Sequence, residues 1–292
     1  MAEATFGERL ARAFSTRGHL CVGIDPHPYL LAEWGLPDDA TGLRRFGTTV
    51  IDAVQGHAGI VKPQVAFFER HGSAGFSALE AVLAAARAAG LLVIADAKRG
   101  DVGSTAQAYG EAWLSPGSPL EADALTVSAY QGVGSLAGPL RLARAAGKGL
   151  LVLAATSNPE SAQQQAAVIA SGPLVGRTVA AGIVDEVNRL NTADAQGTLA
   201  GEVGEIGVVL GATVALGELG IPLGAMPGPR ATPVLAPGFG HQGAAFAELP
   251  ARYGPAAPFV IASTSRGLLS AGPSGITEAA RRQAGELAEC LA

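Results

Sequence analysis

Short apolar runs recur along the chain, and longer alanine-rich stretches with helical spacing separate them. Most of the short runs are continuously apolar rather than alternating, which is the pattern of parallel strands covered on both faces. We therefore predict eight strands: Leu20–Ile24, Gly59–Lys62, Leu91–Ala95, Ala124–Ser128, Leu150–Ala155, Ile206–Leu210, Pro233–Ala236 and Phe259–Ser263. Helical patterns cover Ala78–Ala89, Leu136–Ala146, Val175–Leu190 and Thr277–Leu291. Gly90 and Gly147 follow two of these patterns, as C-cap glycines do.

About eight alternations of strand and helix in 292 residues are the count expected of a (β/α)8 TIM barrel. A doubly wound open sheet would alternate in the same way. Polar or glycine-rich residues follow almost every predicted strand at once, and this favours the barrel, which gathers the C-terminal strand ends around one mouth. We predict a single barrel domain over residues 1–292. The stretch Ser157–Gly204 is long for a crossover, and we expect an extra helix in it.

Composition limits the partners of the protein. Hydrophobic residues make up 48% of the chain, enough for a sizeable core, and charged residues only 15%. A formal net charge of -5 argues against non-specific binding to nucleic acid or to an anionic membrane. The only cysteines are Cys21 and Cys290, the start of the chain lacks a signal-peptide core, and no apolar run is long enough to span a membrane. We expect a cytoplasmic protein.

A charged run, Asp96–Asp101, directly follows the strand predicted at Leu91–Ala95. Because side chains alternate across a strand, Asp96 and Lys98 share a face and lie about 6–7 Å apart along the chain. A solvated loop with an incidental ion pair is the alternative. The chain has only three lysines, however, and Lys62 ends the preceding predicted strand in the same way.

Lysines and carboxylates that alternate in one partly buried site hold each other ionised. Such a network costs desolvation free energy, so it is weak evidence for a stabilising role. The argument favours a functional site at the ends of the second and third strands. Gly100 permits a sharp turn, which can bring Asp101 back towards Lys98.

Two polar loops, Ala236–Gly243 and Ser263–Gly267, follow the seventh and eighth predicted strands. Barrels commonly bind phosphate with these two loops through backbone N–H groups at a short helix start. Glycines such as Gly240 allow the backbone to approach closely, and the Arg266 guanidinium can bind phosphate oxygens. Either loop alone is a common turn, but the pair indicates a phosphate-bearing ligand.

At these positions the sequence resembles the orotidine 5′-phosphate decarboxylase family. That family carries Asp-x-Lys-x-x-Asp at the end of the third barrel strand and a lysine at the end of the second. Asp96, Lys98, Asp101 and Lys62 fit these positions. The motif Asp-Ala-Lys-Arg-Gly-Asp and the chain length are similar to those of the longer subfamily found in many bacteria. The resemblance implies conversion of orotidine 5′-monophosphate to uridine 5′-monophosphate, the last step of de novo pyrimidine nucleotide biosynthesis, with no metal ion and no organic cofactor.

The resemblance also implies catalytic roles. Lys98 is expected to protonate the ring carbon that carbon dioxide leaves, and Asp96 to lie beside the departing carboxylate. Lys62 is expected to support the charged network and to contact the ribose. Asp101 and Thr105 are expected to enter the neighbouring subunit's site across a homodimer interface.

The resemblance likewise implies substrate-binding residues. Asp25 is expected to bind the ribose hydroxyls, and Gln242 and Arg266 the phosphate, in the loop that also contains Gly240. Ser157 is expected to hydrogen-bond the pyrimidine ring. A turn or a helix N-cap remains an alternative role for Ser157.

Three other functions remain open. Related aldolase-like barrels carry the same Asp-x-Lys-x-x-Asp motif and typically use Mg²⁺, although the position of Lys62 argues against them. A non-catalytic phosphometabolite-binding protein would tolerate loss of Lys98. A nicotinamide oxidoreductase rests only on Gly132–Ala137, which fits Gly-x-Gly-x-x-Ala without the acidic residue that should end the next strand. The five histidines show no metal-ligand spacing.

Overall fold

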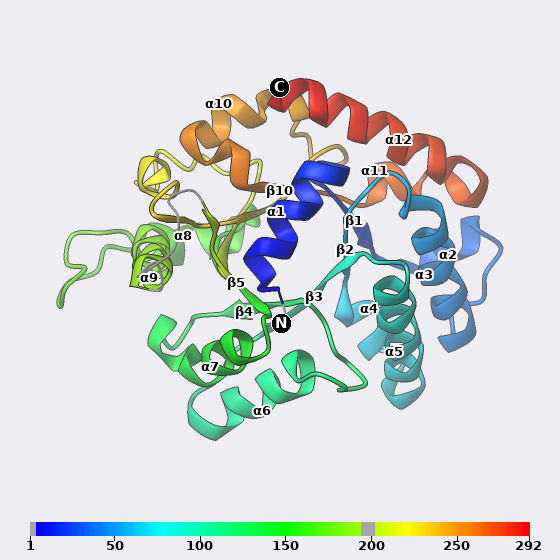
Figure 1. Ribbon diagram of the computed structural model, residues 1–292, viewed down its shortest axis with the longest axis horizontal. Coiled ribbons are helices and arrows are strands. Elements are labelled where there is room, and N and C mark those ends of the chain that lie inside the picture. Colours follow the sequence, from blue (N-terminus) through cyan, green and yellow to red (C-terminus); the bar gives the residue numbers. More distant parts are fainter. Residues whose placement is uncertain (1–3, 194–201) are drawn as a thin grey trace.

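A computed structural model describes residues 4–193 and 202–292 of the chain. Eight parallel strands close into a barrel in the order β1-β10-β9-β7-β5-β4-β3-β2, so the first strand pairs with the last (Figure 1). These strands are β1 (Leu20–Ile24), β2 (Ile60–Pro63), β3 (Leu92–Arg99), β4 (Ala124–Ser128), β5 (Gly149–Ala155), β7 (Ile206–Leu210), β9 (Val234–Pro237) and β10 (Val260–Thr264). The predicted TIM barrel is confirmed.

Helices surround the barrel (Figure 1). They are α1 (Phe6–Arg17), α2 (Pro28–Glu33), α3 (Ala40–Val54), α4 (Val65–Glu69), α5 (Gly72–Ala88), α6 (Gly103–Leu114), α7 (Ala137–Ala145), α8 (Ala162–Ala166), α9 (Val179–Ala193), α10 (Leu249–Tyr253), α11 (Arg266–Leu269) and α12 (Gly272–Leu291). The short strands β6 (Glu202–Val203) and β8 (Arg230–Ala231) form a separate parallel pair. The extra helix expected within Ser157–Gly204 is α8.

The third strand is longer than the sequence pattern indicated. Three of the predicted strands match the structure residue for residue, whereas β3 continues from the predicted end at Ala95 to Arg99. Its register against β4 shifts between Ala95 and Arg99, and Arg99 then pairs with Val127. The apolar run stops at Asp96, but the backbone of β3 continues to pair with β4 as far as Arg99. Asp96 and Lys98 therefore lie within a strand and not in a loop after it.

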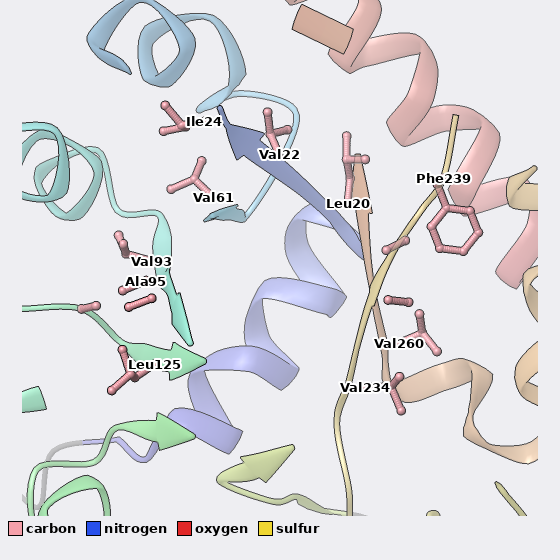
Figure 2. Close-up of a cluster of buried hydrophobic side chains, with 14 of the residues drawn as sticks. Leu20, Val22, Ile24, Val61, Val93, Ala95, Leu125, Val234, Phe239 and Val260 are labelled. Carbon is pink, nitrogen blue, oxygen red and sulfur yellow. The ribbon is translucent and has the colours of Figure 1, made fainter. Parts of the chain in front are cut away.

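Apolar side chains form two layers. One layer packs between the barrel and the helices, and Val22, Ile24 and Val93 belong to it (Figure 2). A second layer contains strand residues of the opposite face, such as Ile94, together with Phe6 of α1. This alternation is the period of two that strands impose on their side chains. Every residue of β1, β7 and β10 is buried, as the continuous apolar runs predicted.

Helix α1 lies across the N-terminal end of the barrel (Figure 1). Arg9 forms an ion pair with Asp123, which directly precedes β4, and donates to the carbonyl of Gly147, which precedes β5. Lys148 Nζ lies 2.7 Å from Glu121 Oε1 at the same end. The third lysine of the chain is thus far from the strand ends where the other two lie. Among the described residues, no helix is both long enough and apolar enough to cross a bilayer.

Candidate active site

A cavity of about 390 Å³ opens at the C-terminal ends of the strands. Its walls contain side chains that come directly after, or from the last residues of, most strands of the barrel. Those used below are Asp25, His27, Lys62, Gln64, Phe67, Asp96, Lys98, Thr126, Thr156, His241, Gln242, Ser265 and Arg266. The expected gathering of polar residues at one mouth is therefore present.

Two lysines bind the two oxygens of one carboxylate at the centre of this cavity. Lys62 Nζ lies 2.7 Å from Asp96 Oδ2, and Lys98 Nζ lies 2.6 Å from Asp96 Oδ1. The side chains of Lys62 and Asp96 are 7% and 10% exposed, whereas that of Lys98 is 45% exposed. Asp96 and Lys62 are thus fixed in the wall, and the Lys98 ammonium remains accessible to a ligand.

Burial and charge act in opposite directions on this cluster. Burial alone would raise the pKa of Asp96, but the charges of Lys62 and Lys98 outweigh it and hold that pKa well below its usual range. Burial would lower the pKa of Lys62, yet Asp96 and Asp25 outweigh it and raise that pKa. Asp96 and Lys62 therefore both stay ionised at neutral pH.

Two neutral residues complete the cluster, and the sequence reasoning missed both. Thr126 Oγ1 donates to Asp96 Oδ1 at 3.0 Å and accepts from the backbone N–H of Lys98 at 3.0 Å. The side-chain amide of Gln64 can form two hydrogen bonds in one of its two orientations. Its nitrogen then donates to Asp96 Oδ2 at 2.6 Å, and its oxygen accepts from Lys98 Nζ at 3.2 Å. The polar run Lys62-Pro63-Gln64 was the only signal for Gln64.

The backbone of Lys98 is held in an uncommon conformation. Its φ is +49°, and it is the only non-glycine residue of the described chain with a positive φ. This region costs an L-residue free energy, and such residues concentrate at functional sites. The hydrogen bond from its N–H to Thr126 helps to maintain the conformation.

Asp25 follows β1 and faces the same cavity. Its Oδ1 is buried and accepts no hydrogen bond in the described part of the protein, and the same holds for Ser265 Oγ. Gly23 allows both side chains to approach, because a Cβ there would lie 2.8 Å from Ser265 Cβ and 3.3 Å from Asp25 Oδ1. An orphaned carboxylate oxygen and a hydroxyl in one wall are suited to a ligand that carries hydroxyl groups.

The two glycine-rich loops meet at one side of the cavity. Gln242 and Arg266 both line it, as the sequence predicted. Gly238 and Gly240 have φ values of +120° and +76°, so this loop needs glycine for its path. Gly240 itself lines a neighbouring cavity of about 440 Å³ behind the loop.

Four predicted site residues lie outside the cavity wall: Gly240, described above, and Ser157, Asp101 and Thr105. Ser157 is exposed, and Thr156 beside it contributes to the wall instead. Asp101 does not return to Lys98; its Oδ1 accepts from the N–H of Val102. Thr105 is exposed on the first turn of α6. Across residues 4–193 and 202–292, no three His, Cys, Asp or Glu side chains are grouped so that they could hold a metal ion.

Comparison with known proteins gives a consistent result. The model of the orotidine 5′-phosphate decarboxylase / HUMPS family matches residues 18–250. Among curated relatives, an orotidine 5′-phosphate decarboxylase of Salinispora arenicola is 51% identical over 290 residues, which cover 99% of this chain and 98% of the relative. A protein of the same name from Streptomyces coelicolor is 50% identical over 270 residues, 92% of this chain and 91% of the relative.

Solved structures agree. A crystal structure of a candidate orotidine 5′-phosphate decarboxylase from Streptomyces avermitilis superimposes with a TM-score of 0.90 at 48% identity, covering 100% of this chain and 97% of the other. The Leishmania donovani OMP decarboxylase gives a TM-score of 0.74 at 26% identity, covering 98% of both chains.

Proposed function

This chain belongs to the orotidine 5′-phosphate decarboxylase / HUMPS family, and on that premise we propose that it converts orotidine 5′-monophosphate to uridine 5′-monophosphate in the cytoplasm. As a member of that family it is a carbon–carbon lyase of pyrimidine biosynthesis. One observation carries the assignment to this particular site: two ammonium groups lie 2.7 and 2.6 Å from one ionised carboxylate inside the cavity.

The proposed reaction uses this charge directly. The bond between the pyrimidine ring and its carboxylate breaks, carbon dioxide leaves, and the electron pair stays on the ring carbon. A preorganised ammonium stabilises that negative charge as it develops. Lys98 is the accessible ammonium, so it gives its proton to the ring carbon and takes another from solvent afterwards.

Lys62 and Asp96 have different proposed tasks. Because Lys62 is almost completely buried, it fixes Asp96 and keeps it ionised rather than transferring a proton. Asp96 holds the Lys98 ammonium beside the reacting carbon and lies next to the departing carboxylate. Gln64 and Thr126 are positioning residues, because each contacts both Asp96 and the Lys98 residue.

The remaining substrate contacts follow from the cavity wall. Asp25 is proposed to bind the ribose hydroxyls with the oxygen that has no protein donor. Gln242 and Arg266 are proposed to bind the phosphate. Ser157 would reach the pyrimidine only if the loop after β5 closes over the ligand, whereas Thr156 already faces the cavity.

We also propose that the enzyme is a homodimer in which Asp101 and Thr105 complete the partner's site. In this chain neither residue contributes to its own cavity wall. Two exposed apolar side chains lie on the same side of the barrel mouth: Val102, next to Asp101, is 54% exposed, and Tyr130, after β4, is 78% exposed. Exposed aromatic and aliphatic groups of this kind are typical of a protein interface.

The direct test is to incubate the purified protein with orotidine 5′-monophosphate in the presence of a chelator and to follow the pyrimidine absorbance. We expect turnover without added metal. Turnover only with added Mg²⁺ would favour a metal-dependent relative of the barrel, and binding without turnover would favour a non-catalytic phosphometabolite-binding protein. Either result would overturn the proposed function.

A further inference from the structure

His27 faces the active-site cavity without a part in the proposed mechanism. It follows Asp25 by two residues, is half-buried and occupies the N-cap position of α2. Arg266 and His241 line the same cavity from the two glycine-rich loops at the other end of the sequence. The fold therefore brings a histidine from the connection between β1 and α2 to the proposed phosphate end of the site.

The imidazole is held in place, yet its nitrogens are free. Its ring packs against Phe67, with centroids 4.2 Å apart and planes inclined by 58°, and the centroid of the Tyr29 ring lies 5.4 Å away. The backbone N–H of His27 donates to the carbonyl of Asp25 at 2.7 Å. Within the described residues no hydrogen bond or ion pair engages either ring nitrogen. A ring fixed by packing with both nitrogens unused is preorganised for a ligand.

Three charged or titratable groups act on this imidazole. Burial lowers the pKa of His27; Asp25 at the end of β1 opposes this, whereas Arg266 on α11 and His241 after β9 lower the pKa further. The other packed residues are Phe67 on α4 and Tyr29 on α2. Burial, Arg266 and His241 therefore favour the neutral form of the ring at pH 7. A phosphate dianion bound by Arg266 would reverse the balance, because it neutralises the arginine and adds negative charge beside the ring.

We propose that His27 is a phosphate-binding residue of this enzyme, which takes up a proton when the 5′-phosphate enters beside Arg266 and then donates an N–H to it. Phosphate is thus held by one permanent cation and by one cation that forms only when the ligand is bound. The inference rests on the proposed function, since that function places the phosphate at Gln242 and Arg266. Thermodynamic linkage determines the direction of the expected pH dependence. A ligand that raises the pKa of a group binds most tightly below the free-state pKa, and this gain in affinity is lost as pH rises through the bound-state pKa.

The test compares dissociation constants of uridine 5′-monophosphate and of uridine between pH 6.5 and 8.5, for the wild type and for His27→Gln. If binding raises the pKa by one unit, wild-type affinity for the nucleotide falls by about two- to fivefold over the window, because the free-state pKa of His27 already lies below its usual value near 6.5. His27→Gln should bind weakly at every pH, without that fall. Uridine should bind both proteins equally and without the pH dependence, which also shows that the variant is folded.

Proton uptake gives a second readout. Calorimetric titration of nucleotide at pH 7.5, in two buffers of different ionisation enthalpy, should show net proton uptake by the wild type and less by His27→Gln. His27→Arg, a permanent cation, should retain affinity and lose the pH dependence. His241→Gln is the matched control and should retain most of the uptake, and Arg266→Ala should weaken nucleotide binding at every pH.

Equal pH slopes and equal proton uptake in the wild type and His27→Gln would overturn the proposal. Equal losses of uridine and nucleotide affinity in the variant would also overturn it, since they would indicate a role that does not involve phosphate. Failure of the proposed function is distinguishable, because it would appear as absence of orotidine 5′-monophosphate turnover in the wild type itself.

Discussion

Lys62 and Lys98 bind the same carboxylate at nearly the same distance, but their side chains are 7% and 45% exposed. This difference separates a buried cation from an accessible one, and the accessible one is the group that we propose as the proton donor. The backbone of Lys98 has a positive φ, a conformation that most residues avoid because it is strained. The strain and the accessible ammonium lie in one residue, so substitutions there should separate activity from stability.

Lys98→Ala and Lys98→Gly form a matched pair for that purpose. Both remove the ammonium, and we expect each to lower kcat/KM by at least about a thousandfold. They differ in the Cβ at φ +49°. The glycine variant should therefore have at least the unfolding free energy of the alanine variant. In regular structure alanine is usually the more stabilising of the two by about 1 kcal/mol. Steady-state kinetics and urea unfolding measure both effects; an alanine variant clearly more stable than the glycine variant would argue against strain.

Asp96→Asn tests the charge network and its pH dependence. The variant leaves Lys62 buried without its counter-ion, so we expect a loss of about 3–5 kcal/mol in unfolding free energy. Because the pKa of Asp96 is held low, its charge contributes stability that is fully present above the ordinary carboxyl pKa and lost as pH falls through the folded-state value. The stability difference between wild type and variant should stay constant from pH 7 to about 5 and shrink only below about 4. A difference that stays constant down to about pH 3 would show that the folded state does not lower the pKa of Asp96.

The sequence predicted the charged members of the site and missed the neutral ones. Lys62, Asp96 and Lys98 stand out because lysine is scarce in this chain and because each follows an apolar run. Thr126 looks like any β-branched residue of a buried strand. Its role depends on the register of β4 against β3, which brings its hydroxyl to Asp96. Asp101 carries the same charge signal as Asp96, yet its carboxylate accepts from the N–H of Val102 and does not line the cavity.

At the scale of elements, the continuous apolar runs predicted where the strands lie but not where β3 ends. Hydrophobic pattern ends β3 at Ala95, whereas backbone pairing continues to Arg99. Helix α1 is absent from the predicted helices, although the Thr5–Glu8 capping box and the helical spacing of Phe6, Leu10 and Ala13 indicate it. The function of that helix depends on the opening it covers, which exists only in the closed barrel.

Phe6→Ala should show what α1 contributes. Phe6 is fully buried, and its ring lies so close to Gly149 that a Cβ there would approach within 2.5 Å. We expect a loss of about 3–5 kcal/mol in unfolding free energy with kcat unchanged, because α1 covers the end of the barrel opposite to the cavity. Denaturant unfolding combined with turnover assays checks this. Leu10→Ala, in the same layer, is the comparison, and a large loss of kcat in either variant would contradict the separation of the two ends.

At the scale of the whole molecule, the proposed homodimer makes each cavity depend on two chains. Lys98→Ala and Asp101→Ala homodimers should each be nearly inactive. If Asp101 serves the partner's site, random exchange of subunits gives heterodimers with one complete site, and about a quarter of wild-type activity should return.

The mixing experiment needs a control for exchange. Mass spectrometry of differently tagged chains shows whether heterodimers have formed. Heterodimers without recovered activity would place Asp101 in its own chain's site. A monomer in solution would remove the homodimer proposal altogether.

Closure of the barrel by its first and last strands also has a consequence for biosynthesis. Leu20 of β1 pairs with Ala262 of β10, so the first strand has an open edge until the last one has left the ribosome. At ordinary elongation rates the delay is roughly 10–50 s. Throughout that interval a nascent chain of continuously apolar strands is exposed to aggregation. A prematurely terminated product that lacks Val260–Thr264 should accordingly bind chaperones or precipitate, whereas the complete chain closes its own edge.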